Sequence, residues 1–224
     1  MGDVAQNDGE AGHQTRHFLV LEALAVAFKS VWGARVQREP PAYLDYSDHR
    51  PDLAAEGLGA GGAMMAMDLK LLDPTGSDGV PDVRGSMVGF GNTQPRARET
   101  TVGLRERGVP ADGPLTFRRD TGTGHVQQRD GDYARALALG CEVCTLLFET
   151  YGGFGPEVVD LIRRLAAERQ NRLTTGEYDL TSWSARSWTT FTNQKLSVAV
   201  HMATAHEIAQ AFGISTAVDP RAAA

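Results

Sequence analysis

The sequence predicts an α/β fold in which helices flank a central mixed sheet of four to five strands. Three patterns carry this prediction. Apolar residues recur at helical spacing in residues 14–32 and again in residues 187–212, and charged residues alternate with apolar ones within residues 64–72. A chain of 224 residues can bury one sizeable core, so we expect a single domain over residues 14–212.

The composition predicts a globular intracellular protein. Hydrophobic residues make up 42% of the chain and charged residues 22%, as in folded domains of ordinary solubility. No apolar run approaches the roughly 20 residues that span a bilayer, and the polar N-terminus carries no secretory signal. We therefore expect no membrane partner.

The net charge of −6 argues against a protein that coats nucleic acid by charge alone. One segment differs, because residues 84–129 hold eight arginines, four acids and no lysine. Arginine suits phosphate contact, and Arg118 and Arg119 are candidate nucleic-acid contacts there. A solvated loop explains this segment equally well.

The first element expected along the chain is a helix over residues 14–32, after a disordered stretch at 1–13. Gly33 ends it. Glu22 lies on this helix away from its apolar stripe and is an acid of the first helix that could reach a site. Alternatively, Glu22 is a solvated residue that pairs with Lys29. The stripe is formed by Phe18, Leu21, Leu24, Ala25, Phe28 and Trp32.

Three strands are expected next, at residues 34–39, from residue 50 onward and at residues 64–72. Glycines between the second and third strands predict a tight turn. Side chains alternate along a strand, so Asp68 and Lys70 share one face of the third strand while its methionines and leucines face a core.

Residues 75–125 show little periodicity and predict a long irregular insertion, with a short helix near residues 98–107. The expected elements that follow are a helix at 130–139, a strand at 142–149, a helix at 156–170 and a helix at 187–212. The last helix should dock an apolar stripe on the sheet through Trp188, Phe191, Val198, Met202, Ala205, Ala209 and Phe212. Residues 213–224 form a flexible tail.

An acid and a lysine on a buried strand are costly to desolvate, which favours a binding role for Asp68 and Lys70. Together with Pro51 and Asp52 they form a Pro-Asp…Asp-x-Lys pattern that resembles the PD-(D/E)xK nuclease motif. The order of the expected elements resembles the restriction-endonuclease-like core of that superfamily. Five segments, at residues 49–53, 67–74, 132–140, 146–166 and 191–209, also resemble the restriction-like endonuclease region of mobile-element proteins from algae and related eukaryotes.

The resemblance implies a metal-dependent DNA endonuclease that hydrolyses phosphodiester bonds, at mobile-element integration sites and hence in the nucleus. Asp52, Asp68 and the carbonyl of Leu69 would bind Mg²⁺ or Mn²⁺, and Glu22 would complete the metal site, as a first-helix glutamate does in several of these families. Lys70 would orient the attacking hydroxide and stabilise the developing negative charge. We expect the Asp52 and Asp68 carboxylates to lie within about 6 Å of each other.

A second resemblance concerns the helix before the fourth strand. Nucleases similar to lambda exonuclease and RecB carry Gln-x-x-x-Tyr on this helix. Here Tyr133 keeps its place and Arg129 replaces the glutamine. Four residues apart on a helix, they would share a face and contact nucleic acid.

Two other functions stay open from the sequence. A nuclease fold without activity would bind nucleic acid or a protein partner, and an unrelated interaction domain would carry the motif by chance. The expected partner is DNA, with a homodimer as a further alternative. Cys141 and Cys144 form a lone CxxC, which has too few ligands for zinc and predicts two buried thiols.

Overall fold

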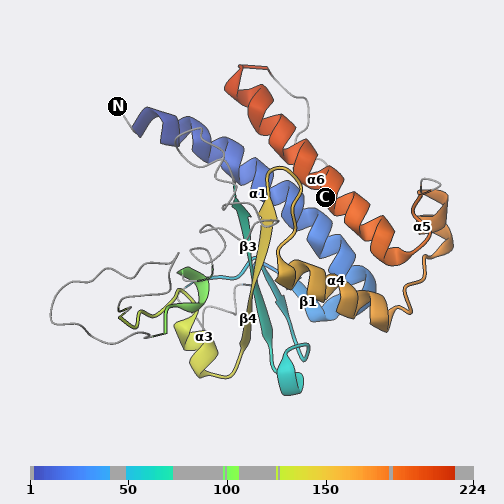
Figure 1. Ribbon diagram of the computed structural model, residues 1–224, viewed down its shortest axis with the longest axis horizontal. Coiled ribbons are helices and arrows are strands. Elements are labelled where there is room, and N and C mark those ends of the chain that lie inside the picture. Colours follow the sequence, from blue (N-terminus) through green and yellow to red (C-terminus); the bar gives the residue numbers. More distant parts are fainter. Residues whose placement is uncertain are drawn as a thin grey trace. The chain divides into compact units, whose positions relative to one another are not determined.

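The computed structural model is an α/β fold with a four-stranded mixed sheet flanked by helices, which confirms the predicted fold class (Figure 1). It describes residues 3–40, 49–72, 98, 100–105, 125, 127–181 and 184–214, with side chains from residue 16 onward. Two compact units divide the chain. The first comprises Met1–Val36, Leu69–Asp73 and Leu146–Ala224, and the second comprises Gln37–Asp68 and Pro74–Thr145.

The sheet has the strand order β1-β2-β3-β4. Its strands are β1 (Val36–Arg38), β2 (Leu53–Ala55), β3 (Met65–Leu72) and β4 (Glu142–Glu149). Strands β2 and β3 are antiparallel, with Leu53 opposite Met67. Strands β3 and β4 run parallel. The amide of Glu142 donates to the Met64 carbonyl, and eight residues further along both strands the amide of Thr150 donates to the Leu72 carbonyl.

The predicted turn between β2 and β3 is present and depends on glycine. Gly57 has a φ of 70° and Gly61 a φ of 65°, a conformation that other residues rarely adopt. Within the turn, the short 3₁₀ helix η3 (Ala60–Gly62) is followed directly by the approach to β3. This turn sets the pairing register of the two strands and therefore decides which residues of β2 and β3 face each other.

The first unit contains α1 (Asp3–Trp32), α4 (Pro156–Glu168), α5 (Thr175–Asp179) and α6 (Trp188–Ala211). Helix α1 begins at Asp3 rather than at residue 14 as predicted. Residues 3–13 contain two glycines and no apolar stripe, so periodicity gives no helix signal there. Helix α5 was not predicted; its start is fixed by a capping box between Thr174 and Glu177.

One stretch, most of it in α1, has the length and hydropathy of a membrane-spanning helix, and it leaves the expectation of no membrane partner untested. Residues Arg16–Arg35 form this stretch. A core helix meets the same criterion, and Val20, Leu24 and Phe28 are fully buried here. Helix α1 packs on α6, and the two run side by side in Figure 1.

Helix α6 contradicts the predicted docking stripe. Val198 is 60% exposed, Met202 58% and Phe212 79%, so the second half of that stripe is not buried. The helix buries the first two members of the predicted stripe, Trp188 and Phe191, and with them five residues outside it: Thr192, Leu196, Val200, Ala203 and His206. The prediction failed because α6 has apolar residues on more than one face, and the packing partner α1 selects between them.

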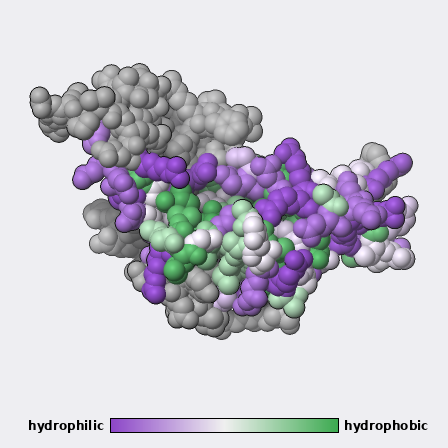
Figure 2. All heavy atoms as spheres, turned by 90° about the horizontal axis from the view of Figure 1, so that it is seen from below, coloured by the Kyte–Doolittle hydropathy of each residue, from purple (hydrophilic) through white to green (hydrophobic). Residues whose placement is uncertain are grey.

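The second unit has a small core under the face of the sheet that carries Asp68. Its buried members are Ala54, Ala66, Tyr133, Ala136 and Cys141. Helix α3 (Ala134–Ala138) is shorter than the predicted helix and supplies Ala136. Cys141 is buried, whereas Cys144 is partly exposed. Hydrophobic side chains also gather on the face shown in Figure 2, between hydrophilic areas.

Candidate functional site

Asp68 is a buried acid on β3. Side chains alternate along this strand, so Ala66, Asp68 and Lys70 point to one face while Met67 and Leu69 point to the other. Asp68 is 8% exposed, whereas Lys70 is half-buried. An ionised carboxylate at such a position requires hydrogen bonds or a positive charge to replace its lost hydration.

Two hydroxyl groups bind the Asp68 carboxylate. Thr101 Oγ1 donates to Oδ2 at 3.1 Å, and the Tyr133 hydroxyl lies 3.4 Å from Oδ1. The same Tyr133 hydroxyl lies 3.2 Å from the Arg50 carbonyl, so its proton is shared between two acceptors. The carboxylate is therefore held at both oxygens.

Thr101 reaches Asp68 because the backbone around it pairs with the segment before α3. The amide of Tyr133 donates to the Thr101 carbonyl, and Leu104 forms an antiparallel bridge with Arg129. Two glycines allow this approach: a Cβ at Gly103 would lie 2.5 Å from the Arg129 carbonyl oxygen, and one at Gly131 would lie 2.6 Å from that of Thr101. This is the described part of the predicted insertion, and it borders Asp68; most of 75–125 lies outside the described residues.

Asp52 immediately precedes β2 and is half-buried. The β2–β3 register pairs Leu53 with Met67, and Asp52 lies one residue before this pairing, at a bend. The amide of Glu39 donates to the Asp52 carbonyl at 2.9 Å. The pair of Leu53 and Met67 thus adjoins both acids along the chain, and the separation of their carboxylates stays a prediction.

The remaining predicted site residues have different positions. Leu69 and Lys70 follow Asp68 directly on β3. Glu22 is half-buried on α1 and belongs to the first unit, so its role at the metal stays a prediction. Arg118 and Arg119 lie outside the described residues.

The predicted helical pairing of Arg129 with Tyr133 is wrong. Helix α3 begins only at Ala134, with Tyr133 as its N-cap residue, and Arg129 lies in the bridge to Leu104. The backbone before α3 pairs with residues 100–104 instead of forming a helical turn. Arg129 is exposed, whereas the Tyr133 ring is buried and its hydroxyl contacts Asp68.

Three residues near Asp68 were not found from the sequence. Thr101 gave no signal, because a single threonine in an irregular segment has no pattern. His49 and Asp132 form an ion pair with 3.8 Å between Nε2 and Oδ1, and the His49 ring lies 6.4 Å from that of Tyr133. In the sequence, the hint of a role for His49 is its position directly before the Arg-Pro-Asp segment that contains Asp52.

The oxygen ligands available around Asp68 suit a hard cation by their chemical type, but they are few in number. Carboxylate and carbonyl oxygens are the ligands that Mg²⁺ prefers, and it often takes only one or two carboxylates and keeps its waters. Within the described ranges, no group of three or more His, Cys, Asp or Glu side chains gathers as a metal site. Asp52 and Asp68 are thus carboxylates of the chemical type that a magnesium ion prefers, and a site formed by them stays a prediction.

The fold and this site define an α/β protein with a buried acid on β3 that accepts hydrogen bonds from two hydroxyl groups. In comparisons with protein-family models, curated proteins and solved structures, nothing matched the chain.

Proposed function

We propose that the chain is a Mg²⁺- or Mn²⁺-dependent DNA endonuclease with a restriction-endonuclease-like core. The observation that carries the proposal is the β2–β3 register, which pairs Leu53, the residue after Asp52, with Met67, the residue before Asp68. This pairing supports a site built from the Pro-Asp…Asp-x-Lys motif, in which Lys70 follows two residues further along β3.

The element order supports the same proposal. Helix α1, the strands β1 to β3, helix α3, strand β4 and helix α4 follow one another as in the restriction-endonuclease-like core described above. The burial of Asp68 supports it independently, because a buried acid lowers stability compared with a well-packed apolar residue and is commonly kept for binding or catalysis. More specifically, we propose that the chain cleaves DNA at mobile-element integration sites in the nucleus.

In this function each residue has a defined role. The Asp52 and Asp68 carboxylates would hold the cation, with the Leu69 carbonyl as a further oxygen ligand. When bound, the cation lowers the pKa of water and offsets the charge of the scissile phosphate. The Lys70 ammonium would stabilise negative charge that develops on that phosphate. Thr101 and Tyr133 would fix the direction of the Asp68 carboxylate.

A second candidate is a module of the same fold that binds nucleic acid or protein without cutting. It is favoured by the hydrogen bonds that occupy both Asp68 oxygens, which give the acid a structural role without any metal. The small number of acids gathered among the described residues favours it as well.

Plasmid nicking by the purified chain in Mg²⁺ or Mn²⁺ tests the proposal. We expect Asp68→Ala and Lys70→Ala to lose about a hundredfold or more of the cleavage rate, since each removes a group that acts on the reacting phosphate. Glu56→Ala is the matched control, because Glu56 is an exposed acid just after β2 in the same unit. It should cut like the wild type, and EDTA should stop both.

The lysine variant separates metal binding from catalysis. Lys70→Ala should still bind Mn²⁺, as measured by calorimetry, whereas Asp68→Ala should bind it weakly. Equal cutting by wild type and Asp68→Ala would exclude the site. Absence of cutting with either metal, together with retained DNA binding, would establish the second candidate.

A further inference from the structure

Helix α6 carries an apolar stripe of which the described residues bury only the first member, Phe191. The residues Phe191, Val198, Met202, Ala205, Ala209 and Phe212, together with Lys195, are spaced alternately by four and three positions. This is the heptad spacing of the seam between two paired helices. Val198, Met202 and Phe212 are each more than half exposed, and Ala205 is exposed too. We call these seven residues the α6 stripe.

Beyond Phe191, which is buried, the stripe is distinct from the face that holds α6 in the fold. That face buries Thr192, Leu196, Val200 and Ala203, and α6 packs on α1. Because the helix is already fixed there, the exposed stripe is not needed to anchor it. Large apolar side chains that gather along one line of a surface commonly mark a binding site.

A hollow of about 430 Å³ lies beside the first turns of the stripe. Helix α6 contributes Phe191, Lys195 and Val198 to its lining. The other side is formed by Ala23 of α1 and by Leu180, the residue that follows α5. Its size falls in the range of roughly 300–1,000 Å³ that accepts small molecules, and it would also take large side chains from a partner helix. All of these residues belong to the first unit.

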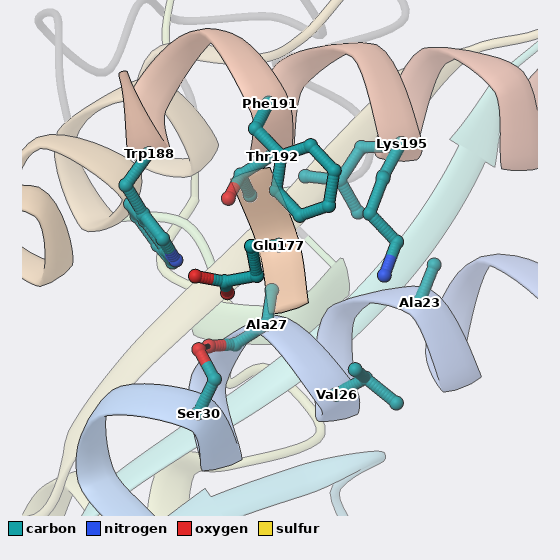
Figure 3. Close-up of a pocket in the computed structure, with 10 residues that line it drawn as sticks. Ala23, Val26, Ala27, Ser30, Glu177, Trp188, Phe191, Thr192 and Lys195 are labelled. Atoms are coloured by element: carbon teal, nitrogen blue, oxygen red, sulfur yellow. Dashed lines mark hydrogen bonds between the residues drawn. The ribbon is translucent and has the colours of Figure 1, made fainter. Parts of the chain in front are cut away.

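Lys195 decides which partner fits. Its Nζ lies 5.3 Å from the centroid of the Phe191 ring, and Figure 3 shows the ammonium group extending from α6 toward α1 beside that ring. Among the described residues Lys195 makes no ion pair. It also lines the neighbouring hollow of Figure 3, where the one described acid, Glu177, pairs with Arg169. A partner that covers the stripe would desolvate the Lys195 charge, and a carboxylate on that partner would offset the cost.

A second copy of the chain offsets this cost poorly. Its own stripe offers one more lysine and no acid. We therefore propose that the α6 stripe binds an amphipathic helix of a partner protein, with apolar residues at heptad spacing and an Asp or Glu facing Lys195. The small side chains of Ala205 and Ala209 let such a helix approach closely at the far end of the stripe.

Binding of a synthetic peptide by the full chain tests this proposal. The peptide carries three heptads with leucine at the seam and one glutamate placed to meet Lys195, and a second peptide has lysine in its place. Fluorescence anisotropy should show that the glutamate peptide binds the wild type about three- to fivefold more tightly than the lysine peptide. Lys195→Glu should reverse this preference.

Substitutions in the stripe locate the binding face. Val198→Asp and Met202→Asp should each weaken binding about tenfold or more by placing a charge in the apolar seam. Ala211→Asp is the matched control, since Ala211 is an exposed residue of α6 outside the stripe. Circular dichroism shows which variants fold. If only one of the two aspartate variants folds, that variant alone is sufficient to test the binding face.

Three results would overturn the proposal. The first is that neither peptide binds. The second is that the peptide binds equally to Val198→Asp, Met202→Asp and the wild type. The third is sedimentation of the chain as a dimer that Val198→Asp or Met202→Asp dissociates, which would assign the stripe to a second copy.

Discussion

The Asp68 site and the α6 stripe depart from the usual distribution of polar and apolar residues in opposite directions. Asp68 is an acid that is only 8% exposed, whereas Phe212 is an aromatic residue that is 79% exposed. An acid normally stays in water, and a row of large apolar residues is normally covered. Both arrangements oppose stability locally, and both therefore point to a role in binding.

The two departures differ in how far the chain compensates them. Asp68 receives hydrogen bonds from Thr101 and Tyr133, so its local environment is complete without any ligand. The α6 stripe has no comparable cover in the described part of the chain. The comparison predicts that changes at Asp68 alter the stability of the chain by itself, whereas changes in the stripe alter only its binding.

The largest stability effect is expected in the apolar core of the first unit, which provides the reference for both regions. Phe28 is fully buried, and its ring centroid lies 5.6 Å from that of Trp32. Phe28→Ala should lower the free energy of unfolding by about 3–5 kcal/mol, because it removes buried area and leaves a cavity. Urea unfolding measures this, and exposed Lys29→Ala should stay within about 0.5 kcal/mol of the wild type.

The next effect concerns Asp68 itself. Asp68→Ala should lower the free energy of unfolding by about 1–3 kcal/mol, because the hydroxyls of Thr101 and Tyr133 lose a buried acceptor. Asp68→Asn keeps one carbonyl oxygen and should lose less. Unfolding in urea without added metal compares the two variants. A gain in stability for Asp68→Ala would mean that repulsion from Asp52 outweighs these hydrogen bonds.

A smaller effect is expected from the hydroxyl donors. Thr101→Val and Tyr133→Phe should each lower the free energy of unfolding by about 0.5–1.5 kcal/mol, the usual contribution of one hydrogen bond. Both donors act on the same carboxylate, so the effects in the double variant should not add. Thermal or urea unfolding of the wild type, the two single variants and the double variant measures this coupling as a double-mutant cycle. Strict additivity would show that the two hydroxyls do not share Asp68.

The smallest effect is expected in the α6 stripe. Val198→Gln and Met202→Gln should change the free energy of unfolding by less than about 0.5 kcal/mol, because both side chains are already more than half exposed. Urea unfolding of the full chain is the measurement, with buried Leu196→Ala as the destabilised reference on the other face of α6. A loss above about 1.5 kcal/mol would show that the stripe belongs to the core and would end the contrast with Asp68.

Local patterns predicted the regular elements well where one period dominates. Strand β4 has the predicted bounds, β3 begins one residue after its predicted start, and α4 starts at Pro156 as expected. In these segments alternation or a proline at the first helical turn is sufficient, because neither depends on a distant partner. The side of β3 that carries Asp68 and Lys70 follows from the same alternation.

The prediction failed where several partners were available to one segment. The apolar residues of α6 are compatible with more than one docking face, and only packing on α1 determines that Leu196 and Val200 are buried while Val198 and Met202 are not. Similarly, the backbone before Tyr133 had a helical alternative, and pairing with residues 100–104 replaced it.

The sequence by itself determined the α/β class, the acid–lysine alternation on β3 and the heptad spacing on α6, because each is a periodicity between near neighbours. The tertiary structure decided which groups surround Asp68. Thr101 is 33 residues and Tyr133 65 residues from Asp68 along the chain, and the register of the β2–β3 turn pairs Leu53 with Met67, the residue before Asp68. Such contacts arise only when distant segments share one core, and periodicity within a single element carries no information about them.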